Sequence, residues 1–133
     1  MPKILPTLLL VLVAAGCGTA DDREQAIGVV ERFYDAVRHD RAEEACAQLS
    51  TAAMTQLESQ TQEACAGAIA RLEYEGGGII DAHVYITNAK VDLRNGESAF
   101  LSREADGWKI TALACRPEQG NPRDRPYECE VEA

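Results

Sequence analysis

The chain has 133 residues, and its 22 acidic side chains outnumber its 13 lysines and arginines, so the formal net charge is −9. A surplus of negative charge opposes contact with the phosphates of nucleic acids and with anionic lipid headgroups. The length suits one domain with one hydrophobic core and is too short for two well-stabilised domains. We therefore expect a single acidic domain with no nucleic-acid partner.

The first residues have the pattern of an export signal. Lys3 precedes an apolar run from Leu8 to Ala15 that is too short to span a bilayer. The small residues before Cys17 resemble a lipobox, the site where signal peptidase II cuts and the cysteine receives diacylglycerol. This resemblance implies a signal peptide over residues 1–16 and a lipid anchor, with acyl chains such as palmitate, on the extracytoplasmic face of the cell membrane. An ordinary secretory cleavage site is the alternative.

Removal of the signal takes away only one charge, that of Lys3, and leaves 117 residues (133 less 16) of net charge −10. Four cysteines besides Cys17 remain in these residues, and an even number in an exported chain indicates two disulfides, for which three pairings exist. We predict Cys46 with Cys65 and Cys115 with Cys129, because the members of each pair are near in sequence. Each bond would stabilise the fold by roughly 3 kcal/mol. The alternative, a zinc site, lacks Cys-x-x-Cys pairs and a nearby histidine.

A lipidated polar tether, residues 17–22, is expected to lead into a helical half. Apolar residues then recur at helical spacing at Ala26, Val30, Phe33 and Val37. They predict an amphipathic helix over about 22–39, with Asp40 as the N-cap of the next helix. The helices expected after it are Arg41–Leu49, a segment capped by Ser50 or Thr51 that runs through Leu57, and a segment from Thr61 to Leu72. Gly76-Gly77-Gly78 ends the helical half.

The second half changes to a strand pattern. Val, Ile, Tyr and Thr are frequent over Ile79–Leu93, which we interpret as one strand whose apolar face switches at a β-bulge near Thr87-Asn88. Asn95-Gly96 and Asp106-Gly107 are hairpin turn signals. Together these features predict an antiparallel meander of three strands.

The turns also predict which strand residues face each other. If both are two-residue loops, one apolar row joins Val91, Phe100 and Leu113 and forms the core face. An ion pair of Glu104 with Lys109 would lie across the second hairpin. The opposite face would be unusually apolar, with Ala99, Leu101, Trp108, Ile110 and Ala112. That face would need a cover, which predicts a homodimer through this second sheet face as one alternative.

This arrangement resembles the NTF2-like superfamily, also described as cystatin-like or SnoaL-like. The likeness covers the long first helix (26–34, AIGVVERFY), the short helices, the bulged meander and the final strand (106–111, DGWKIT). It implies an α+β cone over residues 23–133, in which N-terminal helices pack on a curved antiparallel β-meander and a disulfide closes the C-terminal loop. Some members use the cavity for catalysis, as in ketosteroid isomerase, and others bind or dimerise. The tail from Cys115 to Glu130 resembles the end of small exported proteins of high-GC bacteria.

The best candidate for chemistry is a set of alternating polar residues. Asp81, His83 and Tyr85 share one face of a strand, and Tyr34 and Asp35 are candidates to join them in a pocket. A carboxylate beside an imidazole and a phenol can move a proton at an enolisable carbon. The simpler interpretation, which we favour, is that the strand lies at a sheet edge and these side chains face water. We predict no catalytic set, no metal site and no cofactor.

Three functions are compatible with these features. The leading expectation is a non-catalytic domain, held at the membrane by Cys17, that binds an envelope protein or a small apolar ligand. The second is an isomerase-like enzyme, which requires Asp81 and His83 to point into a closed cavity. The third is a dimeric accessory module with a structural role.

Overall fold

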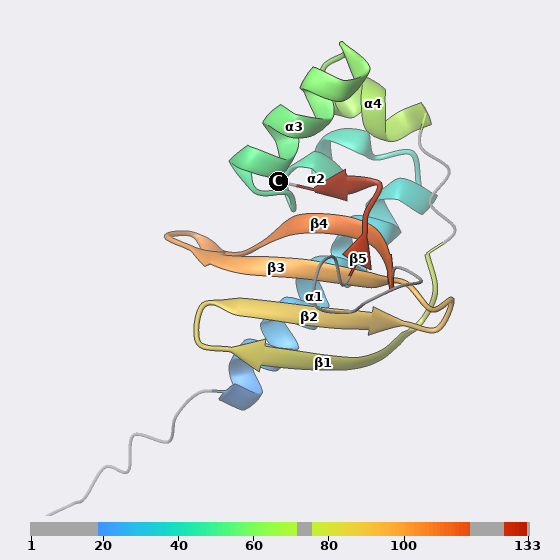
Figure 1. The fold of residues 1–133 in the computed structure, drawn as a ribbon. Helices are drawn as coiled ribbons and strands as arrows, with labels where there is room; N and C mark the ends of the chain where they lie inside the picture. Colours follow the sequence, from blue (N-terminus) through green and yellow to red (C-terminus); the bar gives the residue numbers. More distant parts are fainter. Residues whose placement is uncertain (1–18, 72–75, 118–126, 133) are drawn as a thin grey trace, which may run out of the picture.

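The structure is a computed structural model that describes residues 19–71, 76–117 and 127–132, so Cys17 lies outside the described residues. Within them the chain is α+β, as predicted, with helices that precede an antiparallel sheet (Figure 1). The helices are α1 (Thr19–Arg38), α2 (Ala42–Cys46), α3 (Thr51–Thr61) and α4 (Cys65–Arg71). The strands are β1 (Ile79–Tyr85), β2 (Asn88–Leu93), β3 (Ser98–Glu104), β4 (Gly107–Pro117), β5 (Tyr127–Glu128) and β6 (Val131–Glu132). They follow the order β1-β2-β3-β4-β5, and β6 pairs with β4.

The long helix α1 begins earlier than predicted. Thr19 to Asp22, assigned to the tether from sequence, form its first turn, where Asp21 and Asp22 lie at the positive end of the helix dipole. The apolar stripe of α1 is buried, and α1 runs behind the sheet in Figure 1. Asp40 does not cap α2, because its φ of 56° places it in the turn that follows α1, and Arg41 precedes α2 without a side-chain cap.

The short helices are held by local bonds. The hydroxyl of Ser50 accepts a hydrogen bond from the Ala53 N–H at 3.0 Å, which confirms it as the N-cap of α3. This helix runs on to Thr61, so the predicted helix start at Thr61 is wrong, and α4 begins at Cys65. Cys65 lies at disulfide distance from Cys46, with Cα atoms 6.2 Å apart, and this predicted pair ties α4 to α2.

The stretch expected to be one bulged strand is a hairpin. Ile86 and Thr87 form the turn between β1 and β2, and Val84 lies opposite Ala89. The switch of apolar phase seen in the sequence is therefore a reversal of the chain: Val84 and Ala89 belong to the same face because they are cross-strand partners. The meander accordingly has one strand more than predicted.

The predicted register is wrong by one residue at the β2–β3 turn. The Leu93 N–H donates to the Glu97 carbonyl, so the loop has three residues, and Gly96 supplies the positive φ of 86° that such a loop requires. Val91 consequently faces Ala99, and Phe100 lies on the other face of the sheet.

The β3–β4 turn differs as well. Glu104 pairs with Gly107, which makes Ala105-Asp106 the loop and puts Lys109 opposite Ser102. The predicted ion pair of Glu104 with Lys109 is therefore wrong, and Phe100 faces Ala112 in place of Leu113.

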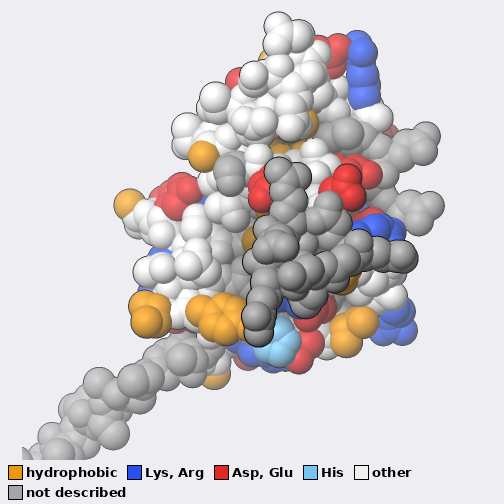
Figure 2. Space-filling view, viewed as in Figure 1, with side chains coloured by type: hydrophobic (Ala, Val, Ile, Leu, Met, Phe, Trp, Pro, Cys, Tyr) orange, Lys and Arg blue, Asp and Glu red, His pale blue; other side chains and the backbone are white. Residues whose placement is uncertain are grey.

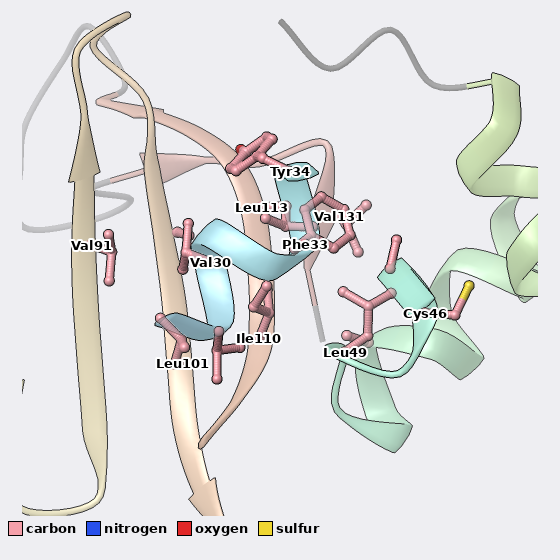
Figure 3. Packing of buried hydrophobic residues seen from close by; sticks show 14 of the residues in the cluster. Val30, Phe33, Tyr34, Cys46, Leu49, Val91, Leu101, Ile110, Leu113 and Val131 are labelled. Atoms are coloured by element: carbon pink, nitrogen blue, oxygen red, sulfur yellow. The ribbon is translucent and has the colours of Figure 1, made fainter. Parts of the chain in front are cut away.

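The face expected to need a cover belongs mostly to the core against which α1 packs. Its members Ala99, Leu101, Trp108 and Ile110 are part of this core, whereas Ala112 lies opposite Phe100 on the other face. Val30 and Phe33 of α1 lie against Leu101, Ile110 and Leu113, and all five side chains are at most 1% exposed (Figure 3). Burial on this scale stabilises by about 1.5–3 kcal/mol per large side chain. The space between α1 and the sheet is packed with side chains.

Candidate functional site

Two of the predicted site residues lie on the face of the sheet opposite α1. Along β1, Ala82 is buried and Val84 packs on the core, while Asp81 and His83 alternate with them. Asp81 lies opposite Asp92 of β2, and His83 lies opposite Lys90. We use the name outer-face cluster for these four residues together with two neighbours, and its members are Asp81, His83, Lys90, Asp92, Ser98 and Tyr127.

Asp92 is the centre of the outer-face cluster. The Ser98 hydroxyl donates to its Oδ1 at 2.6 Å, and the Lys90 ammonium lies 3.0 Å from the same atom. The His83 Nε2 lies 3.7 Å from Asp92 Oδ2 and 3.5 Å from Asp81 Oδ2, so the imidazole stands between two carboxylates. The Lys90 ammonium also lies 5.3 Å from the centre of the Tyr127 ring, within the range of a cation–π contact.

These contacts favour the charged forms of Asp92, Lys90 and Asp81. Burial raises the pKa of Asp92, but hydrogen bonds from Ser98 and Lys90 outweigh burial and hold this pKa below its ordinary value of 3.8. The contact with Tyr127, followed by that with Asp92, raises the pKa of Lys90 although burial opposes this. A hydrogen bond from Arg23 lowers the pKa of Asp81.

The structure separates the other predicted members from this cluster. Tyr34 is 4% exposed, packs edge-on against Phe33 with ring centres 5.3 Å apart, and burial raises its pKa. It also lies so close to Gly76 that a Cβ atom there would meet its ring at 2.6 Å. Tyr85 is 62% exposed at the end of β1. A pocket shared by Tyr34, Asp81, His83 and Tyr85 is therefore not formed.

The outer-face cluster is open to solvent at Asp81 and His83 and lacks an activated nucleophile. The side chains of Asp81 and His83 are 46% and 49% exposed, and Ser98 donates to a carboxylate and not to the imidazole that would be needed to activate it. Among the described residues no group of His, Cys, Asp and Glu is arranged to hold a metal ion. The arrangement presents alternating charges to solvent.

Open hollows flank α1 where charged residues gather. One of about 540 Å³ is lined by Arg32, Asp35 and Arg38 along with Tyr34 and the glycines that precede β1. Charged walls disfavour a small apolar ligand, because its binding would remove these groups from water.

Comparison with protein families, with characterised proteins and with solved structures finds no match to this chain. The site therefore has to be interpreted from its own geometry.

Sequence reasoning missed four members of the outer-face cluster, Lys90, Asp92, Ser98 and Tyr127. The signal that could have found Lys90 and Asp92 is the dipeptide Ile86-Thr87 interpreted as a turn, because a hairpin about these two residues puts His83 opposite Lys90 and Asp81 opposite Asp92. The pattern of β-branched residues masked that turn.

Proposed function

We propose that this chain is an exported lipoprotein, anchored through Cys17 to the extracytoplasmic face of the cell membrane, whose non-catalytic domain binds an envelope protein through the outer-face cluster. The single observation that carries the binding role is the pair of half-exposed side chains Asp81 and His83, which stand beside Asp92 on the side of the sheet opposite the one packed on α1. A surface of alternating charge favours recognition of a complementary polar protein surface.

Export is supported by the cysteines. Both predicted pairs lie at disulfide distance, with sulfur atoms 2.09 Å apart, and disulfides persist in oxidising compartments outside the cytoplasm. None of the described helices is long and apolar enough to cross a membrane. A lipid on Cys17, with at least two acyl chains, would supply stable attachment.

An NTF2-like fold remains part of this proposal, supported by the order of helices before an antiparallel meander and by α1 packed on one face of the sheet. The isomerase alternative has less support, because the space it needs between α1 and the sheet is filled and Asp81 and His83 face away from it. The dimer was predicted to cover an apolar sheet face that α1 covers.

Two experiments test the proposal. Cys17→Ala should move the protein from the membrane fraction to the soluble fraction, and retention in the membrane would contradict the anchor. A photoreactive residue at His83 should give a discrete cross-linked product in whole cells, whereas the same residue at Gln60, exposed on α3, should not. Adding Asp92→Asn should reduce the yield at position 83. Equal products from both positions would contradict a binding role for the outer-face cluster.

A further inference from the structure

The turn between β1 and β2 carries the most exposed large apolar side chain among the described residues. Ile86 is 93% exposed, and Tyr85 next to it is 62% exposed. Two adjacent apolar side chains at this hairpin tip therefore stay exposed to water in the folded domain, which is unfavourable for them. Figure 2 shows hydrophobic side chains at this end of the sheet, viewed as in Figure 1.

This tip lies beside the first turn of α1. Ala20, Arg23 and Tyr85 line one hollow of about 370 Å³, so the start of the helix and the end of β1 are neighbours, as Figure 1 also shows. Arg23 joins the two elements further, because its Nε donates to the Ala82 carbonyl at 3.1 Å. The end of the domain from which the chain leads back toward Cys17 is thus the end that carries the exposed apolar tip.

The distance to the proposed anchor is short. Thr19, the first residue of α1, is two residues after Cys17. Two residues span at most about 7 Å even when fully extended. A lipid on Cys17 would therefore hold the β1–β2 tip within reach of the bilayer surface.

We propose that Tyr85 and Ile86 insert into the interfacial region of the bilayer that holds the anchor, and so fix the orientation of the domain. This inference rests on the proposed lipid anchor. Tyr favours the membrane–water interface, and an isoleucine beside it adds apolar area that the headgroup region can bury. The contact can be weak, because the tether makes it intramolecular and supplies a high effective concentration.

The charge near the tip decides the type of contact. Asp21 and Asp22 lie in the first turn of α1, and Asp22 is paired with Arg103. Arg23 is likewise paired, with Asp81 at 2.8 Å. Because the two described arginines near the tip are each paired with an aspartate, they leave no surplus positive charge for anionic headgroups, and the contact is apolar insertion that does not require anionic lipid.

Ile80 offers a matched control on the same strand. It is 63% exposed and lies near the other end of β1, about 20 Å from Ile86 at the usual rise per strand residue. Ile80→Trp and Ile86→Trp introduce the same apolar side chain, so any general attraction of tryptophan to lipid acts on both. Only insertion of the tip distinguishes them.

The test uses the lipidated full chain, purified from membranes and reconstituted in phosphatidylcholine vesicles with bromine on the upper acyl positions. Fluorescence of the unsubstituted chain, from Trp108, is subtracted. We expect about half of the emission added by Ile86→Trp to be quenched, since interfacial insertion reaches about 5–10 Å. Emission from Ile80→Trp should be unchanged.

The outcomes separate the inference from its premise. Protein that does not float with vesicles overturns the anchor itself. Protein that floats but shows no quenching at position 86 overturns insertion while the anchor stands. Equal quenching at positions 80 and 86 also overturns it, because the domain would then lie with the whole β1 edge on the membrane. Quenching that appears only with added phosphatidylglycerol overturns the apolar contact.

Discussion

The C-terminal strands depend on one disulfide, and its removal is a sharp test of the fold. Cys115 and Cys129 are bonded across a separation of 14 residues, and Val131, just beyond them, is fully buried opposite Leu113. The perturbation is the double substitution Cys115→Ala with Cys129→Ala. Closing a loop of this length lowers the entropy of the unfolded chain, so its loss should reduce the free energy of unfolding by about 3 kcal/mol.

The free energies of ordering and burial predict whether the C-terminal strands stay attached in the folded double variant. Ordering the backbone from Tyr127 to Glu132 costs at least about 1 kcal/mol per residue, or about 6 kcal/mol for these six residues. Burial of Val131 returns about 2 kcal/mol. The few ladder hydrogen bonds, such as Glu130 N–H to the Leu113 carbonyl at 3.1 Å, return about 1 kcal/mol each. Without the disulfide these terms nearly cancel, so the tail should detach in a substantial fraction of folded molecules.

Amide hydrogen exchange measures this directly. In the double variant the Glu130 amide should lose most of its protection while the amides of β2 and β3 keep theirs. Cys46→Ala with Cys65→Ala is the matched control: its loop of 19 residues predicts a similar loss of about 3 kcal/mol, yet Glu130 should stay protected. If Glu130 remains protected in the first variant, the reasoning that the disulfide holds the tail in place is refuted.

Three further predictions concern individual residues. Phe33→Ala should lower the free energy of unfolding by about 3–5 kcal/mol, because Phe33 is fully buried between α1 and the sheet; a change under about 1 kcal/mol in urea titration would contradict the packed core. Ser50→Ala should cost about 1 kcal/mol and Ser50→Thr less, since only the first loses the cap hydroxyl. Because the pKa of Asp92 is lower in the folded protein, the charged carboxylate stabilises the fold at pH values above its ordinary pKa of 3.8. This stabilisation is lost as the pH falls through the pKa of the folded state. Asp92→Asn should therefore reduce the free energy of unfolding by about 1–2 kcal/mol near neutral pH. The further loss of stability below pH 3.8 should be smaller in this variant than in the unsubstituted protein. Urea midpoints measured near neutral pH and below pH 3.8 check both expectations.

Features that depend on near neighbours in sequence were predictable. The N-cap at Ser50 requires only a hydroxyl three residues before an amide, and the helical half and the strand half follow from the period of apolar residues. The two cysteine pairs were accessible because each joins positions close in the chain.

The register could not be obtained in the same way. Asn95-Gly96 is compatible with a two-residue loop and with a three-residue loop, and the choice of three moved Phe100 from the core face to the outer face. A slip of one residue reverses every side chain of a strand. Because of this reversal, the register predicted from sequence left an apolar face without a cover. It also placed Ser98 away from the candidate site.

The amino-acid sequence by itself determined the secondary-structure halves and the acidic charge, and it favoured the cysteine pairing that the structure shows, because composition and short spacings carry that information. It is also the sole basis for the proposed anchor at Cys17. Only the tertiary structure decided that the space beside α1 is packed, that Asp81 and His83 meet Asp92 and Lys90, and that Tyr85 lies beside the first turn of α1. These are contacts between distant segments, and they depend on loop closures whose alternatives differ by one residue.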